Sequence, residues 1–340
     1  MRHVNAPSRT IATVTLTSFR VLITGGSGFI GTNLIEALSA LGADITNFDV
    51  SAPLDFRHRG FWTSGDVRDG NALEEVLRHD MPTHVIHLAA RVDIKGQTLD
   101  DYSTNVVGTT NLLNALRTSP EVQRVIVAST QFVGQPGHVP TRDDDYKPHT
   151  AYGQSKVEAE KLTRQSDLPW VIIRPTTIWG PHDLSYRRMF YRVMDRGLYL
   201  HPGRIPCHRS MGFVGNLVDQ VLRLLTNEAS RVLGSTFYLG DPVVNLINFV
   251  DEFSLRITGR PARTAPPGVL RALAHGGDLL QSLRLPAPIT TGRLASMTED
   301  FVVPIEDTFA VTGAPPISLE AAVKATVDWL EAEGVVRKRR

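Results

Sequence analysis

The sequence predicts an α/β protein with a doubly wound parallel sheet and a smaller C-terminal lobe that binds substrate. Three observations support this class. Short β-rich runs alternate with helical patterns through the first half of the 340 residues. Residues 84–88 (HVIHL) and 124–128 (RVIVA) are mostly apolar and do not alternate with polar residues, as expected of strands buried on both faces. A glycine-rich turn, "TGGSGFIG", joins the first strand to the first helix.

The elements of the first half follow one another in a regular order. "RVLITG" at 20–25 is a strand pattern, and "FIGTNLIEALSALG" at 29–42 is an amphipathic helix closed by Gly42. The same alternation then predicts strands at 43–50, 61–67, 83–90, 122–130 and 169–180, and helices at 70–79, 103–119 and 150–166. Parallel strands need crossover connections, so helices are expected on both faces of the sheet.

The chain is predicted to contain three parts. Residues 1–18 lack acidic residues and are expected to be a disordered extension, with a targeting segment as the alternative. Residues 19–180 form the dinucleotide-binding domain. Residues 181–335 form the substrate lobe, partly threaded back into the main sheet, with helices at 180–197, 213–229 and 318–334 and a strand at 235–240.

Composition excludes several classes of function. The chain has 36 Lys and Arg against 35 Asp and Glu, so no strong field for nucleic acid is expected. Cys207 is the single cysteine, which excludes an intrachain disulfide and favours a cytoplasmic, reducing compartment. His201 and His208 flank Cys207 in a proline-containing loop, where packing is favoured and no metal site is predicted. No apolar run is long enough to predict a membrane span.

The glycine turn predicts a dinucleotide site. Gly25, Gly28 and Gly31 allow a tight turn and a close approach of the backbone to a pyrophosphate. Phe29 and Ile30 begin the helix whose N-terminus offers N–H groups to the phosphates. Asp49 ends the second strand, where an acid accepts hydrogen bonds from ribose hydroxyls and repels a 2′-phosphate. NAD is therefore favoured over NADP.

Further strand ends supply the rest of the predicted cofactor pocket. Asp66 and Val67 suit adenine, with a carboxylate for the exocyclic amine and an apolar wall for the ring. Leu88, Ala89 and Ala90 end the fourth strand with mostly small side chains, where the backbone is expected to pass close to the cofactor.

The stretch "HTAYGQSKVEAEKL" predicts the catalytic pair. Tyr152 and Lys156 are four positions apart and therefore lie on one helix face. Transfer of a hydride from a carbinol also requires a group that takes the hydroxyl proton. A phenol titrates near 10, and a nearby ammonium together with a nicotinamide cation is expected to lower that pKa. Ser129, at the end of the fifth strand, is expected to hydrogen-bond the phenol and to position the substrate oxygen.

Together these residues resemble the extended short-chain dehydrogenase/reductase family, and within it the NAD-dependent epimerase/dehydratase group. The motifs are "TGGSGFIG", Asp49, "GDV", "HLAA", "NVVGTTNLLNA", "STQFVG", "YGQSK" and "RPTTIWGP", over roughly residues 20–335. The resemblance implies a Rossmann fold, a Ser129–Tyr152–Lys156 catalytic set and bound NAD. It also implies that Asn105 has a structural role near the active site and that Pro175 and Thr176 pass along the nicotinamide. Asn105, Tyr152 and Lys156 are counted among the cofactor-binding residues, with Lys156 holding the nicotinamide ribose. Family members commonly dimerise through two helices, here 99–117 and 151–166.

The substrate class is open between two branches of the family. Thr130 and Gln131 stand where sugar dehydratases carry an acid, so elimination of water is disfavoured and a nucleotide-sugar epimerase or reductase is preferred. The segment "MGFVGNLVDQ" is similar to the 3β-hydroxysteroid dehydrogenase branch, which is the second hypothesis. A non-catalytic NAD-bound regulatory protein is the third. Four residues are predicted to contact substrate: Thr130, Gln131, Arg187 and Arg209. Arg187 and Arg209, with Arg188, suit a pyrophosphate, although 185–192 also reads as a solvated basic helix face.

Overall fold

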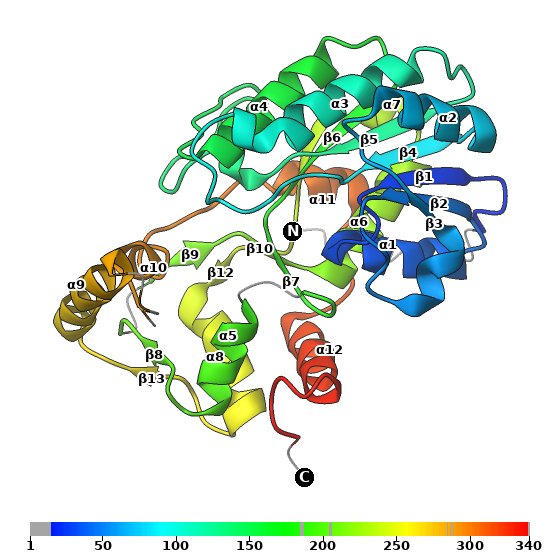
Figure 1. Ribbon diagram of the computed structural model, residues 1–340. Helices are drawn as coiled ribbons and strands as arrows, with labels where there is room; N and C mark the ends of the chain where they lie inside the picture. Colours follow the sequence, from blue (N-terminus) through cyan, green and yellow to red (C-terminus); the bar gives the residue numbers. More distant parts are fainter. Residues whose placement is uncertain are drawn as a thin grey trace, which may run out of the picture.

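The computed structural model describes residues 15–183, 187–203, 206–283, 285, 287 and 289–338. A seven-stranded parallel sheet runs through the larger part of the molecule in the order β11-β6-β5-β4-β1-β2-β3 (Figure 1). Its strands are β1 Arg20–Thr24, β2 Asp44–Asp49, β3 Trp62–Ser64, β4 His84–His87, β5 Arg124–Ala128, β6 Trp170–Pro175 and β11 Thr236–Leu239. The doubly wound fold predicted from the sequence is confirmed.

Helices cover both faces of this sheet (Figure 1). On one face α2, α3 and α4 pack side by side, and on the other α1 packs against α6. Their bounds are α1 Phe29–Ala40, α2 Gly70–Asp80, α3 Ser103–Leu116, α4 Ala151–Arg164 and α6 Val214–Thr226, with 3₁₀ turns η1 Phe56–Phe61, η2 Asp100–Tyr102 and η3 Gln131–Val133. The order of the strands reverses between β1 and β4, which opens a crevice at their carboxyl ends.

The two faces of the sheet explain the continuous apolar runs. Ile86 and Ile126 belong to the core cluster on the side of α1 and α6, whereas Val85 and Val125 belong to the cluster under α2 and α3. Successive side chains of a strand point to opposite faces, so a strand covered on both sides has apolar residues on both of its faces.

Three expectations for element boundaries need correction. Leu16 lies within the predicted disordered extension, yet its side chain is 1% exposed in the core and its N–H donates to the carbonyl of Leu41. Leu16 is therefore part of the folded core, and residues 1–14 lie outside the described part. Strand β3 is shorter than predicted, because residues 65–67 leave the sheet as a turn. Helix α5 begins at Arg187 rather than 180.

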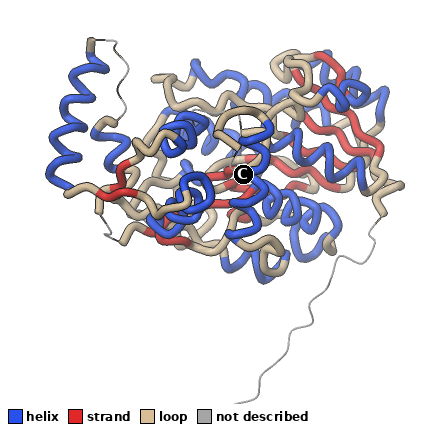
Figure 2. Tube along the Cα trace, turned by 90° about the horizontal axis from the view of Figure 1, so that it is seen from below, coloured by secondary structure: helices blue, strands red, loops and turns tan. Residues whose placement is uncertain are grey.

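Much of the chain after β6 forms a lobe beyond the carboxyl ends of the strands, whereas residues Glu306–Thr312 (α11) pack against α6 and β11 beside the main sheet (Figures 1 and 2). Strand β11 returns from this part of the sequence to pair with β6 in the main sheet. The remaining strands are β7 Thr177–Trp179, β8 Leu200–His201, β9 His208–Arg209, β10 Met211–Phe213, β12 Val244–Asn245 and β13 Arg263–Thr264. The remaining helices are α5 Arg187–Asp195, α7 Ala229–Val232, α8 Leu246–Thr258, α9 Pro267–Ser282, α10 Thr291–Ala295, α11 Glu306–Thr312 and α12 Leu319–Ala332. In the described part of the chain, none of these helices has both the length and the apolarity to cross a bilayer.

Candidate active site

The glycine turn brings two backbone segments into direct contact. Gly25 has a φ of +75°, and a Cβ there would lie 2.5 Å from the amide nitrogen of Ala89 at the end of β4. A Cβ on Gly31 would lie 2.4 Å from the Cα of Gly26. Because side chains are excluded at both points, the turn between β1 and α1 can only be made with glycine.

The N-terminus of α1 is suited to bind an anion. Gly28 is its N-cap, no side chain caps the first turn, and the first turn contains no acidic residue. The first N–H groups of the helix therefore have no capping oxygen from a side chain, and the helix dipole favours negative charge there. Phe29 and Ile30, the predicted cofactor residues of this turn, are half-buried against the core.

Asp49 lies at the end of β2, next to the glycine turn. Its Oδ2 accepts a hydrogen bond from the N–H of Ser27 at 3.0 Å, and its Oδ1 accepts one from the N–H of Ser51 at 2.9 Å. The Oγ of Ser27 in turn donates to the carbonyl of Ser51 at 2.7 Å. Sequence reasoning missed Ser27, whose position between the glycines was the available signal. These bonds fix the direction of the carboxylate.

The predicted adenine residues have different surroundings. The carboxylate of Asp66 binds the guanidinium of Arg68 at 2.5 Å, and this hydrogen bond lowers the pKa of Asp66. Val67 is buried, and a Cβ on Gly108 would lie 2.5 Å from its Cγ2, so α3 packs closely on this strand end. Leu88 and Ala90, with Ala89 between them, are half-buried after β4.

Asn105 joins the loop after β4 to α4. Its Oδ1 accepts from the N–H of Arg91 at 2.8 Å, and its Nδ2 donates to the carbonyl of Arg91 and to Ser155 Oγ. The side chain is fully buried. Protein groups therefore occupy both ends of the amide, which fits a supporting role for Asn105 rather than direct contact with a cofactor.

The structure brings Ser129, Tyr152 and Lys156 together at the carboxyl end of β5. Lys156 Nζ donates a hydrogen bond to the carbonyl of Ala128 at 2.8 Å, which anchors α4 to the strand. All three side chains are buried. The Oγ of Ser129 makes no hydrogen bond in the structure, whereas Tyr152 hydrogen-bonds to the side chain of Thr130. The expected bond between Ser129 and the phenol is thus replaced by one from the neighbouring residue.

The pKa values of the pair are governed mainly by burial. Burial raises the pKa of Tyr152 to about 12, and the hydrogen bond with Thr130 acts in the opposite direction. Burial also lowers the pKa of Lys156 to about 8, partly opposed by the carboxylate of Glu160 one turn further along α4. Desolvation is the largest influence on the pKa of the phenol in the protein alone, and the lowering expected from the ammonium together with a nicotinamide cation stays a prediction.

Two other predicted residues lie near this set. Thr176 follows β6 and is buried, and its Oγ1 has no hydrogen-bond partner in the structure. Gln131 donates from Nε2 to Thr177 Oγ1 at 2.8 Å, while its Oε1 has no partner. Pro175 is half-buried at the end of β6. Unpaired buried oxygens are uncommon in folded proteins, so they mark positions where a bound molecule can supply the missing donor.

Aromatic rings connect this set to the lobe. Phe132 has its ring centroid 6.2 Å from that of Tyr152 and 5.9 Å from that of Phe301. The guanidinium of Arg209 lies over Phe301, 5.6 Å from its centroid, and donates to the carbonyl of Glu299. A chain of three contacts, through Phe301 and Phe132, therefore links Arg209 to Tyr152. The side chain of Arg187 lies outside the described part of the structure.

Sequence reasoning also missed Tyr102 and His87. The ring of Tyr102 lies 5.9 Å from that of Tyr152 and is fully buried. His87 is enclosed between Thr24 and Thr109, 2.6 and 3.1 Å away, and burial lowers its pKa to about 3. Both contacts join residues far apart in the sequence, so no local pattern reveals them.

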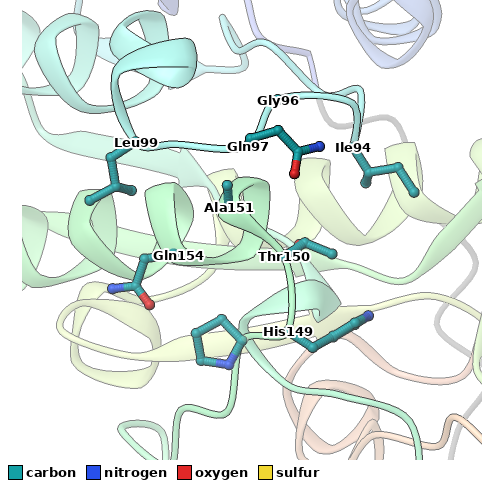
Figure 3. Close-up of a pocket in the computed structure, with 9 residues that line it drawn as sticks. Ile94, Gly96, Gln97, Leu99, His149, Thr150, Ala151 and Gln154 are labelled. Carbon is teal, nitrogen blue, oxygen red and sulfur yellow. The ribbon is translucent and has the colours of Figure 1, made fainter.

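A cavity of about 550 Å³ lies beside the start of α4 (Figure 3). The loop after β4 contributes one wall and the N-terminal turn of α4 the other (Figure 3). Its lining residues are Ile94, Gly96, Gln97, Leu99, Pro148, His149, Thr150, Ala151 and Gln154. None of the predicted catalytic side chains lines this cavity.

The residues present fit NAD. A backbone turn without side chains, an uncapped helix N-terminus and an oriented carboxylate converge at the switch point between β1 and β4. The unpaired hydroxyls of Ser129 and Thr176 follow β5 and β6. The helix N-terminus suits a pyrophosphate, the carboxylate suits a ribose, and the two hydroxyls suit a polar ring system.

Comparisons with known proteins agree with this geometry. Residues 21–240 match the model of the NAD dependent epimerase/dehydratase family. The chain is 30% identical over 242 residues to N-acetyl-alpha-D-glucosaminyl-diphospho-ditrans,octacis-undecaprenol 4-epimerase of Escherichia coli O157:H7, covering 68% of this chain and 70% of the relative. It is also 30% identical to a 3-beta-hydroxysteroid dehydrogenase of Mycolicibacterium neoaurum, over 58% of each chain.

The fold is likewise shared with solved structures. The Bordetella bronchiseptica enzyme WbmG, solved in complex with NAD, superposes with a TM-score of 0.71 at 23% identity, covering 94% of this chain and 96% of that one. The predicted resemblance to this family is confirmed, and NAD is confirmed as the cofactor of the family. This chain therefore belongs to the NAD dependent epimerase/dehydratase family of extended short-chain dehydrogenases/reductases.

Proposed function

We propose that this protein is an NAD-dependent epimerase or reductase of a nucleotide sugar, with Tyr152 as the acid/base. One observation carries the proposal. The buried hydroxyl of Ser129, which lacks a protein partner, and the buried pair Tyr152 and Lys156 meet at the carboxyl end of β5, near the glycine turn. Sugar epimerases among the relatives support the substrate class.

Each side chain has a distinct task in this proposal. When bound, NAD accepts a hydride from the carbinol carbon and can return it. Ser129 donates to the substrate oxygen, and Tyr152 exchanges the hydroxyl proton at its phenol oxygen. Because burial keeps the phenol protonated, Tyr152 is poised to donate a proton to a ketone oxygen, and its action as a base requires further positive charge nearby. Lys156 holds the end of β5 and supplies a cation.

We assign the cofactor contacts to the predicted residues of the glycine turn and of the segments that follow the strands. Gly25, Gly28, Phe29, Ile30 and Gly31 would hold the pyrophosphate, and Asp49 the adenosine ribose. Asp66, Val67, Leu88, Ala89 and Ala90 would surround adenine and the adjacent backbone, with Pro175 and Thr176 along the nicotinamide. Thr130, Gln131 and Arg209 are proposed to contact the substrate, since Arg209 can meet an anionic diphosphate across the aromatic rings.

Substitution of Tyr152 by Phe tests the assignment. It keeps the ring packing against Tyr102 and Phe132 and removes the proton-transfer atom, so turnover should fall by about 10²–10⁴-fold. NAD affinity, measured by calorimetry, should stay within the error of the wild type. Unchanged turnover in the variant would remove Tyr152 from the chemistry, and absence of any turnover in the wild type would favour a non-catalytic NAD-bound regulator.

A hydroxysteroid-type dehydrogenase is the second candidate, favoured by the similarity to 3-beta-hydroxysteroid dehydrogenases. Absorbance of reduced cofactor distinguishes the two classes. A sugar epimerase converts substrate without a net change in NADH, and a sugar reductase consumes one NADH for each product. A steroid dehydrogenase instead forms one NADH for each product. Thermal-shift screening with UDP-, GDP- and dTDP-sugars beside sterols identifies the ligand class, because a ligand of the folded state raises the melting temperature.

We also propose a homodimer that pairs α3 and α4 of two copies. The two helices pack side by side on one face of the sheet. Four apolar side chains are exposed on or just before α3: Val92, Ile94, Leu99 and Val107. Sedimentation equilibrium tests this: Val107→Glu should produce monomers, and a wild-type monomer would contradict the proposal.

A further inference from the structure

Helix α9 carries an apolar face that no other described element covers. The helix projects at the far left of the molecule, next to α10 and away from the main sheet (Figures 1 and 2). Only a small cluster anchors it, with Leu270 and Ala274 buried against Leu294. Leu279, Leu283, Val269 and Leu273 are 64%, 63%, 51% and 50% exposed, respectively.

The exposed apolar residues form one continuous face. At 100° per residue, Val269, Ala272, Leu273, Gly276, Leu279, Leu280 and Leu283 fall within an arc of about 120°. Arg271, His275 and Ser282 lie on the opposite side, and the buried Leu270 and Ala274 lie between these two faces. The helix is therefore attached to the protein by its buried side and has one apolar and one polar face exposed. Such a helix is typical of those that lie in the plane of a membrane interface.

The charge of the residues around α9 indicates which partner could cover its apolar face. Residues 260–298 contain five arginines and one aspartate, a formal charge of +4. Arg260, Arg263 and Arg271 are exposed. A second copy of the same face would bring like charges together in a two-fold interface, whereas an anionic lipid surface complements them.

We propose that α9 docks this protein onto an anionic bilayer surface. The apolar face enters the boundary between headgroups and acyl chains, and the surrounding arginines contact anionic headgroups. No membrane-crossing helix is needed, in accord with the described helices. The proposal stands independently of the assigned chemistry.

Vesicle co-sedimentation tests the proposal with the full chain. The wild type should bind vesicles of phosphatidylcholine mixed with phosphatidylglycerol, and binding should fall with added salt. The double variant Leu279→Gln/Leu283→Gln should bind at least about tenfold more weakly, because two apolar side chains leave the interface. Arg260→Gln/Arg263→Gln should weaken binding to the anionic vesicles in the same direction.

Control variants show whether weaker vesicle binding is specific to substitutions on and beside α9 or follows from any loss of exposed apolar or charged side chains. Met81→Gln/Leu255→Gln removes two comparably exposed apolar side chains elsewhere, and Arg78→Gln/Arg117→Gln removes two exposed charges. Both controls should bind as the wild type does, and all variants should retain NAD affinity. Equal loss in the controls, no binding by the wild type, or equal binding to pure phosphatidylcholine would overturn the proposal. So would conversion of a dimer to a monomer by the α9 leucine variant, since a second copy would then be the occupant.

Discussion

Lys156 Nζ donates a hydrogen bond to the carbonyl oxygen of Ala128 at 2.8 Å, so a buried ammonium ties α4 to the end of β5. Ser129 follows that carbonyl directly, and Tyr152 lies one turn earlier on α4. A single contact thereby fixes the relative position of the strand and the helix that carry the proposed catalytic set. It also places a cation where water is excluded, which has a measurable consequence.

Lys156→Met is expected to lower turnover by about 10²-fold or more, because it removes both the anchor and the cation. Its effect on stability should depend on pH. The pKa of Lys156 is lowered from 10.5 to about 8, so between these values the unfolded chain binds more protons than the folded chain. The free energy of unfolding of the wild type, relative to the variant, should therefore rise from pH 8 to 10.5.

Urea unfolding at several pH values measures this difference. Lys161→Met is the matched control, since Lys161 is exposed on the same helix. A difference between wild type and Lys156→Met that stays constant across this pH range would mean that the ammonium is not desolvated.

Gly31→Ala is expected to abolish NAD binding and to destabilise the fold. The added Cβ would lie 2.4 Å from the Cα of Gly26, a backbone atom that cannot move aside without opening the turn. Overpacking of this kind costs about 1–3 kcal/mol of unfolding free energy. Gly292→Ala on α10 meets no atom within 4 Å and should be neutral or stabilising by up to about 1 kcal/mol. Thermal melts and NAD titration compare the two, and retained NAD affinity in Gly31→Ala would argue against the cofactor site.

Asp49→Ala is expected to weaken NAD binding by about tenfold or more, because a charged hydrogen-bond acceptor for the ribose is lost. The ratio of NADP to NAD affinity should rise, since the carboxylate that repels a 2′-phosphate is gone. Asp44→Ala, at the exposed opposite end of β2, should change neither affinity. Calorimetric titration with both dinucleotides gives the ratio, and the assignment fails if the preference stays at the wild-type value.

His87→Asn is expected to remove part of the acid sensitivity of the protein. Burial lowers the pKa of His87 from 6.5 to about 3, so below pH 6.5 the unfolded chain gains a proton that the folded chain resists. The corresponding stability is present above pH 6.5 and is lost as the pH falls toward 3, by about 1.4 kcal/mol for each tenfold rise in proton concentration. Acid unfolding followed by circular dichroism should therefore be less steep in the variant. His275→Asn, a surface substitution, is the control that should reproduce the wild-type curve.

Sequence patterns predicted some helices of the lobe and missed others. The sequence predicts a helix at 318–334, and α12 is observed at Leu319–Ala332, because its apolar residues recur with a helical period. Helix α8 was missed, although Asn245 caps its start and Gly259 closes it. Helix α9 was also missed: Pro266 and Pro267 stand at its start, and Gly276 and Gly277 interrupt it, which hides its period.

The sequence by itself determined the alternating elements, the glycine turn and the placement of Tyr152 and Lys156 on one helix face. All of these depend on residues a few positions apart, whose relations are set by backbone geometry. Only the tertiary structure decided that Leu16 enters the core, that Thr130 rather than Ser129 bonds the phenol, that desolvation raises its pKa, and that α9 keeps an uncovered apolar face. Those features arise from packing between distant segments, and the exclusion of water that sets their energies depends on the whole fold.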